Sequence, residues 1–217
     1  MRGVSIPFQD YAKELADKLA NILKSSDEAC LVGLPGLMFK WPTEESDYTR
    51  DWMLKNRMYF LDFLSGRINL EKEYIAAGFT CYYMGRKDGS TNSLELHYEK
   101  KKRLFEGKRL VIFAGDHILS GLSHNVFERA KSIEIVHCPK KNAFSVYSQI
   151  MDKARSYPME GTVLGFILGP TATALAWELS MEGYLAWDLG HIAKDYDAYC
   201  KQIGNTEQDS NSFFAPD

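Results

Sequence analysis

The sequence has no long run of apolar residues. No stretch approaches the roughly 20 consecutive apolar residues that a helix needs to cross a bilayer, and the N-terminus lacks the hydrophobic segment of a signal peptide. These absences predict a protein without a transmembrane segment. We expect it to be cytoplasmic, with peripheral binding at the inner membrane face as the alternative.

Cysteine is scarce and scattered. The four cysteines, Cys30, Cys81, Cys138 and Cys200, form no C-x-x-C pair, which argues against a zinc knuckle and against a redox dithiol. Cys30 and Cys81 lie in apolar runs that we expect to be buried strands, where a free thiol behaves as a small hydrophobic group.

The chain also lacks an excess of charge of one sign. Its formal net charge is -3 over 217 residues, so we expect no nucleic acid partner. The basic cluster at residues 100–103 is expected to be a solvated helix face. With 45% hydrophobic and 25% charged residues, the composition is that of an ordinary globular domain.

Three well-known motifs are absent as well. The sequence contains no G-x-G-x-x-G after a strand, no Walker A loop and no G-x-S-x-G turn, which argues against a dinucleotide oxidoreductase, a P-loop protein and an α/β-hydrolase. A hydrolase that uses Ser123 or Asp116 with His117 or His124 is the least favoured hypothesis. The spacing of Asp116, His117 and His124 matches no standard zinc pattern.

The N-terminal third predicts two helices and two strands. Apolar residues recur at three- and four-residue steps in residues 10–24 and again in residues 47–64, which predicts helices. The apolar runs at residues 29–34 and 79–84 are expected to be buried strands of a parallel sheet.

From residue 110 onward, strand-like and helical segments alternate regularly. Strands are predicted at residues 110–114, 133–137, 163–168 and 184–187, each followed by a turn and an amphipathic segment. This alternation predicts an α/β fold, a Rossmann-like, doubly wound, mainly parallel sheet with helices on both faces. Residues 1–203 are expected to form one domain, and residues 204–217 a polar tail that frays, in which Phe213 and Phe214 could dock.

Ligands of such sheets bind beyond the carboxyl ends of the strands, so the turns there carry the candidate residues. Residues 169–173, Gly-Pro-Thr-Ala-Thr, precede a helix expected to begin near Thr171, whose N-terminus would attract a diphosphate or carboxylate. Gly115 opens the turn after an earlier strand. The alternative for residues 169–173 is a plain helix cap with tight packing.

A second turn, residues 138–144, contains two lysines and an asparagine. Lys140 or Lys141 would meet a ligand phosphate, and Asn142 would hold a base or ribose or act as a helix N-cap. Arg86 and Lys87 would contact a pyrophosphate or serve as surface residues. For both segments the structural alternative, a capped helix or a polar loop, stays open.

Asp188 and His191 follow the last predicted strand. Both can bind a divalent metal, and either can accept a proton, although both residue types are also common in solvated turns. The D-x-D string at residues 195–197 falls in a predicted helix, where its two carboxylates do not share a face. It is therefore a weaker metal candidate.

Four segments in this order resemble the bacterial GT-D-fold glycosyltransferases: S-I-P-F-Q at residues 5–9, C-P-K-K-N-A-F at 138–144, L-G-P-T-A-T at 168–173 and G-Y-L-A-W-D-L-G-H at 183–191. The resemblance implies a Rossmann-like domain that binds a UDP-sugar with a divalent cation, Mn²⁺ or Mg²⁺. It also implies transfer of the sugar to a bacterial cell-surface glycan or glycoprotein, with a homodimer or a partner transferase as possible assemblies.

The resemblance assigns residues to this site. Asp188 and His191 would be catalytic and bind the metal. The nucleotide-sugar would be bound by Arg86, Gly115, Pro139, Lys141, Asn142, Gly169, Pro170, Thr171 and Thr173.

The sequence departs from the family pattern in several places. In the family, an R-x-G-D-G-E turn with a D-x-E metal-binding motif precedes the S-I-P-F-Q segment, and here residues 1–4 read Met-Arg-Gly-Val. Ala114, the His124-Asn125 pair and Ala193 stand where the family has an acidic residue, an N-D pair and an aspartate. Two explanations remain: the carboxylates are encoded upstream, which we favour slightly, or this is a non-catalytic nucleotide-sugar-binding or scaffold member.

Overall fold

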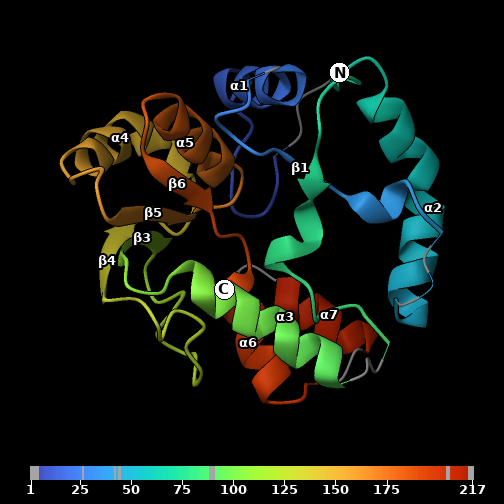
Figure 1. Ribbon diagram of the computed structural model, residues 1–217. Coiled ribbons are helices and arrows are strands. Elements are labelled where there is room, and N and C mark those ends of the chain that lie inside the picture. The colour runs from blue at the N-terminus through green and yellow to red at the C-terminus, as the bar shows by residue number, and fades with distance from the viewer. Residues whose placement is uncertain are drawn as a thin grey trace.

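A computed structural model describes residues 5–25, 27–41, 43, 45–87, 91–203 and 206–214. Its centre is a four-stranded sheet with the order β4-β3-β5-β6 (Figure 1). The strands are β3 (Arg109–Gly115), β4 (Ser132–Cys138), β5 (Thr162–Ile167) and β6 (Leu185–Asp188). All three pairings are parallel, so the four strands predicted after residue 110 are confirmed to within one or two residues.

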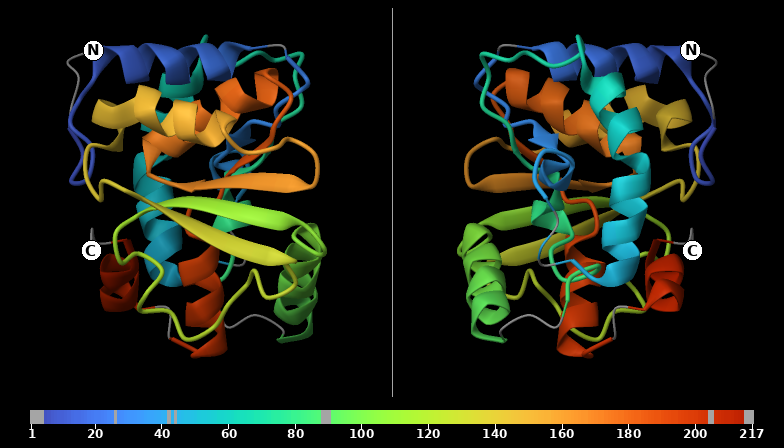
Figure 2. Two further views of the ribbon diagram at one scale, coloured as in Figure 1. Left: turned by 90° about the vertical axis from the view of Figure 1, so that its left-hand side faces the viewer. Right: turned by 90° about the vertical axis from the view of Figure 1, so that its right-hand side faces the viewer.

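Helices cover both faces of this sheet, as predicted (Figure 2). One face packs against α4 (Tyr147–Arg155) and α5 (Pro170–Met181), and α1 (Lys13–Lys24) lies on α5. The other face packs against α3 (Thr91–Leu104) and α6 (Ile192–Cys200). The doubly wound arrangement is therefore confirmed.

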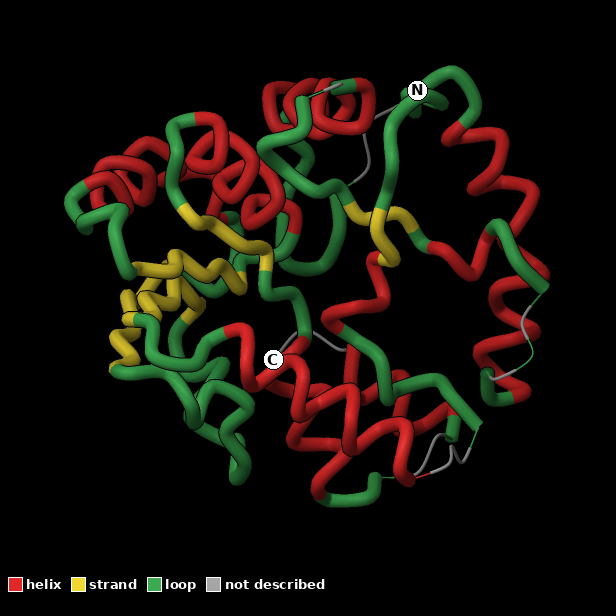
Figure 3. The backbone as a smooth tube through the Cα atoms, in the orientation of Figure 1, coloured by secondary structure: helices red, strands yellow, loops and turns green. Residues whose placement is uncertain are grey.

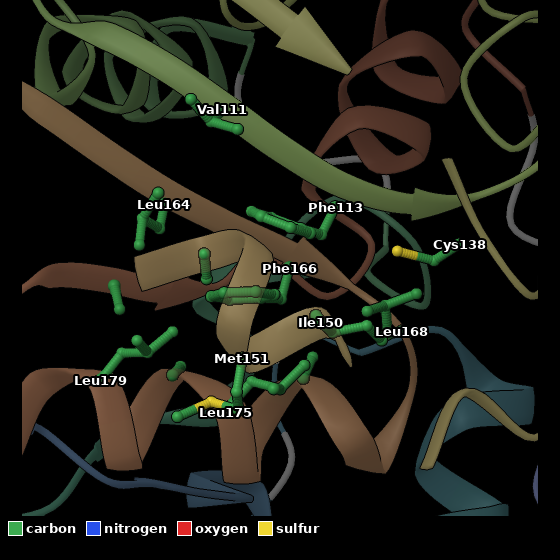
Figure 4. Close-up of a cluster of buried hydrophobic side chains, with 14 of the residues drawn as sticks. Val111, Phe113, Cys138, Ile150, Met151, Leu164, Phe166, Leu168, Leu175 and Leu179 are labelled. Atoms are coloured by element: carbon green, nitrogen blue, oxygen red, sulfur yellow. The ribbon is translucent and has the colours of Figure 1, made fainter. Parts of the chain in front are cut away.

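Alternation of buried side chains explains why β3 and β5 lie at the centre. Val111, Phe113 and Phe166 point towards α4 and α5 (Figure 4), while Leu110 and Ile112 point towards α3 and α6. The rings of Phe113 and Phe166 stack with centroids 5.0 Å apart. A strand that is apolar on both faces needs a helix layer on each side.

The N-terminal part differs from the two buried strands expected there. Residues 29–34 supply only β1 (Gly33–Leu34), which pairs with β2 (Ile75–Ala76) in a separate two-stranded sheet, and Leu31 is 69% exposed. Residues 79–84 form no strand: they continue from the 3₁₀ helix η2 (Ala77–Thr80) into an irregular segment. Cys30 and Cys81 therefore lie outside strands. All four cysteines are free thiols.

The carboxylate of Asp195 explains why residues 82–84 do not pair in a sheet. The backbone N–H groups of Tyr82, Tyr83 and Met84 all donate to it, at 2.7 to 3.1 Å, and so does the hydroxyl of Tyr98, at 2.7 Å. The backbone donors that a strand would use are satisfied by one buried side chain. The segment is thereby fixed to α6.

Two further helical segments precede residues 79–84 in the sequence. The helix predicted at residues 47–64 is present as α2 (Asp47–Leu64), with the hydroxyl of Ser46 accepting from the Thr49 N–H. A short 3₁₀ helix, η1 (Gly36–Met38), packs against it. Figure 3 shows the loops on both sides of α2.

Part of the expected polar tail is a helix. α7 (Glu207–Phe214) buries Phe213 against Met84 and Ala198, and this burial holds the helix on the domain. No helix in the described part of the chain is long and apolar enough to cross a membrane.

The basic cluster at residues 100–103 is a solvated helix face only in part: Lys100 and Arg103 are exposed as expected, but Lys101 and Lys102 are buried. Lys101 is 1% exposed, and its ammonium lies 3.9 Å from Asp195 and over the rings of Phe79 and Tyr98. Lys102 is also buried and forms an ion pair with Glu128 at 2.7 Å. A buried carboxylate on the neighbouring helix therefore draws in a charge that sequence composition assigns to the surface.

Burial lowers the pKa of Lys101 to about 8, from an ordinary value of 10.5. Between pH 8 and pH 10.5, Lys101 is protonated in the unfolded chain and deprotonated in the folded protein. The free energy of unfolding should therefore rise with pH in this range. We expect this rise, approaching about 3 kcal/mol, to be absent in Lys101→Met. Urea unfolding of both proteins across this pH window gives the difference, and parallel profiles would contradict the assignment.

Candidate functional site

A cleft lies at the carboxyl ends of the four central strands. We call it the strand-end cleft; its volume is about 310 Å³, within the range of small-molecule sites. Its walls come from the turns after β3, β4, β5 and β6, together with Phe8 and the end of α7. This is the position at which doubly wound sheets bind ligands.

Most of the predicted site residues line this cleft. They are Gly115, Pro139, Lys141, Gly169, Pro170, Thr173, Asp188 and His191. Three others do not line it: Arg86, Asn142 and Thr171. The turns are thus brought together as expected, and individual side chains within them point elsewhere.

The turn before α5 presents a helix N-terminus to the cleft. Gly169 has φ 55° and ψ -142°, and α5 begins at Pro170, close to the predicted start. A Cβ at Gly169 would lie 2.8 Å from the ring of Phe8, so this position needs glycine both for its backbone and for the close approach of that ring. The free N–H groups of the first helical turn give this wall a partial positive charge.

The segment at residues 5–9 fastens two of these turns. The carbonyl of Phe8 accepts a hydrogen bond from the Asn142 N–H at 2.9 Å, and the Gln9 side-chain oxygen accepts from the buried Thr171 hydroxyl at 3.3 Å. Thr171 therefore positions the turn, and its hydroxyl is directed at Gln9 and not into the cleft.

Asn142 occupies the N-cap position that its place in the sequence suggests, but its side chain does not cap the helix. Its backbone is left-handed, with φ 54°, and it makes no side-chain cap to η3 (Ala143–Val146). Instead its side chain accepts from the N–H of Asp10 at 2.6 Å and donates to the carboxylate of Asp10 at 2.7 Å. The asparagine joins the β4 turn to the N-terminal segment.

Arg86 also has structural partners. Its guanidinium lies 4.4 Å from the centre of the Tyr82 ring, and its backbone bridges to Glu45.

The position of Gly115 in the cleft has no room for a side chain, since a Cβ there would lie 2.9 Å from the Cα of Lys140. Its small size allows the β3 and β4 turns to meet.

Asp188 and His191 line the cleft from the end of β6 and the turn that follows it. The carboxylate of Asp188 accepts from the Thr173 hydroxyl at 2.6 Å and from the Gly190 N–H at 3.0 Å. Surrounding protein raises the pKa of Asp188, and these two hydrogen bonds oppose that rise. The residue nevertheless keeps an exposed surface, which faces the cleft that it lines.

The aromatic end of α7 packs against His191. The imidazole lies 5.4 Å from the ring of Phe213 and 5.3 Å from that of Phe214, measured between centroids. Lys194 donates to the carbonyl of Phe213 at 2.7 Å. These contacts place His191 between the β6 turn and α7.

The cleft is basic on balance. Lys140, Lys141 and Lys194 line it, and Asp188 is the one carboxylate among its described lining residues. Within the described ranges, no group of three or more His, Cys, Asp or Glu residues is placed to hold a metal ion. Asp188 and His191 thus supply two donors, which fits a cation shared with substrate phosphates better than an all-protein site.

The other polar candidates have structural roles outside the cleft. Asp195 fixes residues 82–84, while Asp197 accepts from the N–H groups of Ser123 and His124, both at 3.0 Å, and pairs with the His124 ring. Asp116 pairs with His137 at 3.0 Å rather than with His117 or His124. The proposed hydrolase pairs are therefore not assembled.

Several cleft residues were missed from the sequence. Among them are Phe8, Ile118, Leu122, Lys194, Phe213 and Phe214. Only the Phe213–Phe214 pair, in an otherwise polar tail, could have indicated such a role from the sequence. For the remaining residues, no local pattern distinguishes a residue that lines the cleft from one in the hydrophobic core.

Comparison with known proteins identifies the family of the chain. Residues 1–213 match the family described as glycosyltransferase GT-D fold. The chain belongs to this family. It is 29% identical over 196 residues to a probable glycosyl transferase of Streptococcus gordonii and 29% identical over 201 residues to glycosyltransferase GlyD of Streptococcus pneumoniae. The matches cover 90% and 91% of this chain but only 28% and 24% of the relatives.

Solved structures show the same fold. A structure described as a domain of unknown function 1792 with a distinct glycosyltransferase fold has a TM-score of 0.84 and 30% identity, covering 99% of this chain and 79% of that one. Another, described as a new glycosyltransferase from Streptococcus sanguinis, has a TM-score of 0.81 and 28% identity, covering 95% and 80%. This GT-D-family chain therefore carries the α/β glycosyltransferase fold expected from its sequence.

Replacing Gly169 with alanine tests the turn before α5. We expect Gly169→Ala to lower the free energy of unfolding by about 1–3 kcal/mol, because its backbone conformation and the Phe8 ring both exclude a methyl group. Gly121→Ala is the matched control, since a Cβ there meets nothing within 4 Å. Urea unfolding compares them, and equal stability of the two variants would refute the steric argument.

Proposed function

We propose that this GT-D-family chain binds a UDP-sugar in the strand-end cleft and transfers the sugar to a bacterial cell-surface glycan or glycoprotein. The observation that carries the proposal is the convergence, in one cleft, of a helix N-terminus, three lysines and the carboxylate of Asp188. The first two favour an anionic diphosphate, and the third is suited to the sugar end.

The diphosphate would lie between α5 and the β4 turn. The N–H groups at the start of α5 and the ammonium groups of Lys140 and Lys141 all favour negative charge. Charge builds up on the diphosphate as it leaves the sugar, so groups fixed beforehand around that position stabilise the transition state more than the ground state.

Asp188 and His191 would face the sugar end of the donor. The Thr173 hydroxyl and the Gly190 N–H fix the orientation of the Asp188 carboxylate, and α7 fixes His191. We propose that these two residues hold a divalent cation, Mn²⁺ or Mg²⁺, together with the diphosphate. Such a cation, when bound, would supply positive charge to the leaving group.

Removing the two exposed lysines tests the diphosphate position. We expect the double variant Lys140→Ala, Lys141→Ala to bind UDP about tenfold or more weakly than the wild type. We also expect added salt to weaken UDP binding less in the double variant than in the wild type. Lys55→Ala, an exposed lysine of α2 outside the cleft, is the control. Calorimetric titration with UDP and manganese gives the affinities, and an unchanged affinity in the double variant would rule out this placement.

A second function, nucleotide-sugar binding without transfer, is favoured by one observation. Within the described residues, no group of three or more His, Cys, Asp or Glu is placed to hold a metal ion, and Asp188 is the single carboxylate that lines the cleft. In this case the chain would act as a binding or scaffold partner of an active transferase.

Turnover separates the two functions. With manganese and a panel of UDP-hexoses, we expect the protein to release UDP, and we expect Asp188→Asn to reduce that release at least about a hundredfold while UDP still binds. UDP release measured by a coupled assay gives the rate. Binding without release in the wild type would establish the second function and overturn the first.

A further inference from the structure

The outer edge of β4 is an unpaired sheet edge. β4 pairs with β3 on one side, and no strand of the described chain pairs with its other side. In the left view of Figure 2 this strand faces the reader, with no other element drawn across it. Two large apolar side chains, Ile133 and Ile135, are 39% and 44% exposed on it.

This edge lacks the usual protection against pairing. β4 has seven residues and contains neither proline nor glycine, and such a regular edge offers a row of free N–H and C=O groups. Its one carboxylate, Glu134, is engaged on the α4 side by Arg109 and by the Tyr157 hydroxyl. The charge that would discourage an incoming strand is therefore already neutralised.

The side chains along the other face of β4 differ in charge between its two ends. Ile133, Ile135 and His137 share this face, and the alternation, continued to the residue just before β4, places Lys131 on it as well. His137 pairs with the carboxylate of Asp116 at 3.0 Å. The row therefore runs from a cation, through two isoleucines, to an imidazole and a carboxylate. When the row is turned by 180° about Ile135, Ile135 meets Ile135, and the cationic end meets the end that carries the His137–Asp116 pair.

We propose that this chain forms a two-fold symmetric dimer in which β4 pairs antiparallel with β4 of a second copy, centred on Ile135. Ile135 then faces Ile135 of the second copy, and Ile133 faces His137. Lys131 lies diagonally from that His137, within reach of Asp116. The two four-stranded sheets become one continuous sheet.

This arrangement leaves both strand-end clefts open. Because the two β4 strands run in opposite directions, their carboxyl ends, and hence the two clefts, lie at opposite sides of the joined sheet. The dimer therefore needs no ligand to form and does not depend on the function proposed above.

Cysteine cross-linking tests the register. Directly opposite residues of an antiparallel pair have Cβ atoms about 5 Å apart, so Ile135→Cys should give a disulfide-linked dimer under mild oxidation. Ile133→Cys, which faces His137 rather than itself, should cross-link much less, and the wild type controls for the four native cysteines. Equal cross-linking of both variants would overturn the proposed register.

Sedimentation equilibrium tests the dimer itself. We expect Ile135→Lys to raise the dimer dissociation constant at least about tenfold, because two like charges would face each other. Leu70→Lys, at an apolar residue 88% exposed elsewhere, should not. Lys131→Glu should weaken the dimer, and adding Asp116→Lys should restore it. Circular dichroism checks that each variant is folded, and a wild type that stays monomeric at high concentration would refute the dimer.

Discussion

The buried carboxylate of Asp195 joins parts of the chain that share no sheet. Four donors from residues 82–84 and Tyr98 converge on it, and Lys101 lies beside it. These contacts tie α3 and the irregular segment before it to α6, which begins directly after the Asp188–His191 turn. An uncompensated buried charge costs several kcal/mol, so the packing of this whole side of the sheet depends on these donors staying in place.

The sequence predicted those elements of the fold that a local pattern of residues determines. β3, β5 and α2 were predicted because continuous apolar runs and three- and four-residue periodicity require burial on two faces or on one. Residues 79–84 are equally apolar, yet they form no strand because Asp195, more than a hundred residues away in sequence, takes their N–H groups. Nothing local marks that capture, and the same applies to the burial of Lys101.

The candidate site shows the same division. Strand order brings Gly115, Gly169 and Asp188 to one edge, and turn positions alone predict this. Side-chain direction is decided by partners from elsewhere: Asn142 turns to Asp10, Thr171 to Gln9 and Arg86 to Tyr82. The basic character of the cleft could be predicted from the sequence only in part, since Lys194 reaches the cleft from α6, whose residues were not assigned to the nucleotide-sugar site.

The strand-end cleft is lined by both Phe8 and Phe214, which lie near opposite ends of the chain. Its central walls come from the intervening β3 to β6 turns, so the enclosed site exists only once the first and last elements have both docked on the sheet. A chain in which α7 has not docked would hold an open groove, and His191 would lack its ring contacts with Phe213 and Phe214. Docking of α7 therefore completes the binding site, which separates folding of the sheet from the onset of ligand recognition.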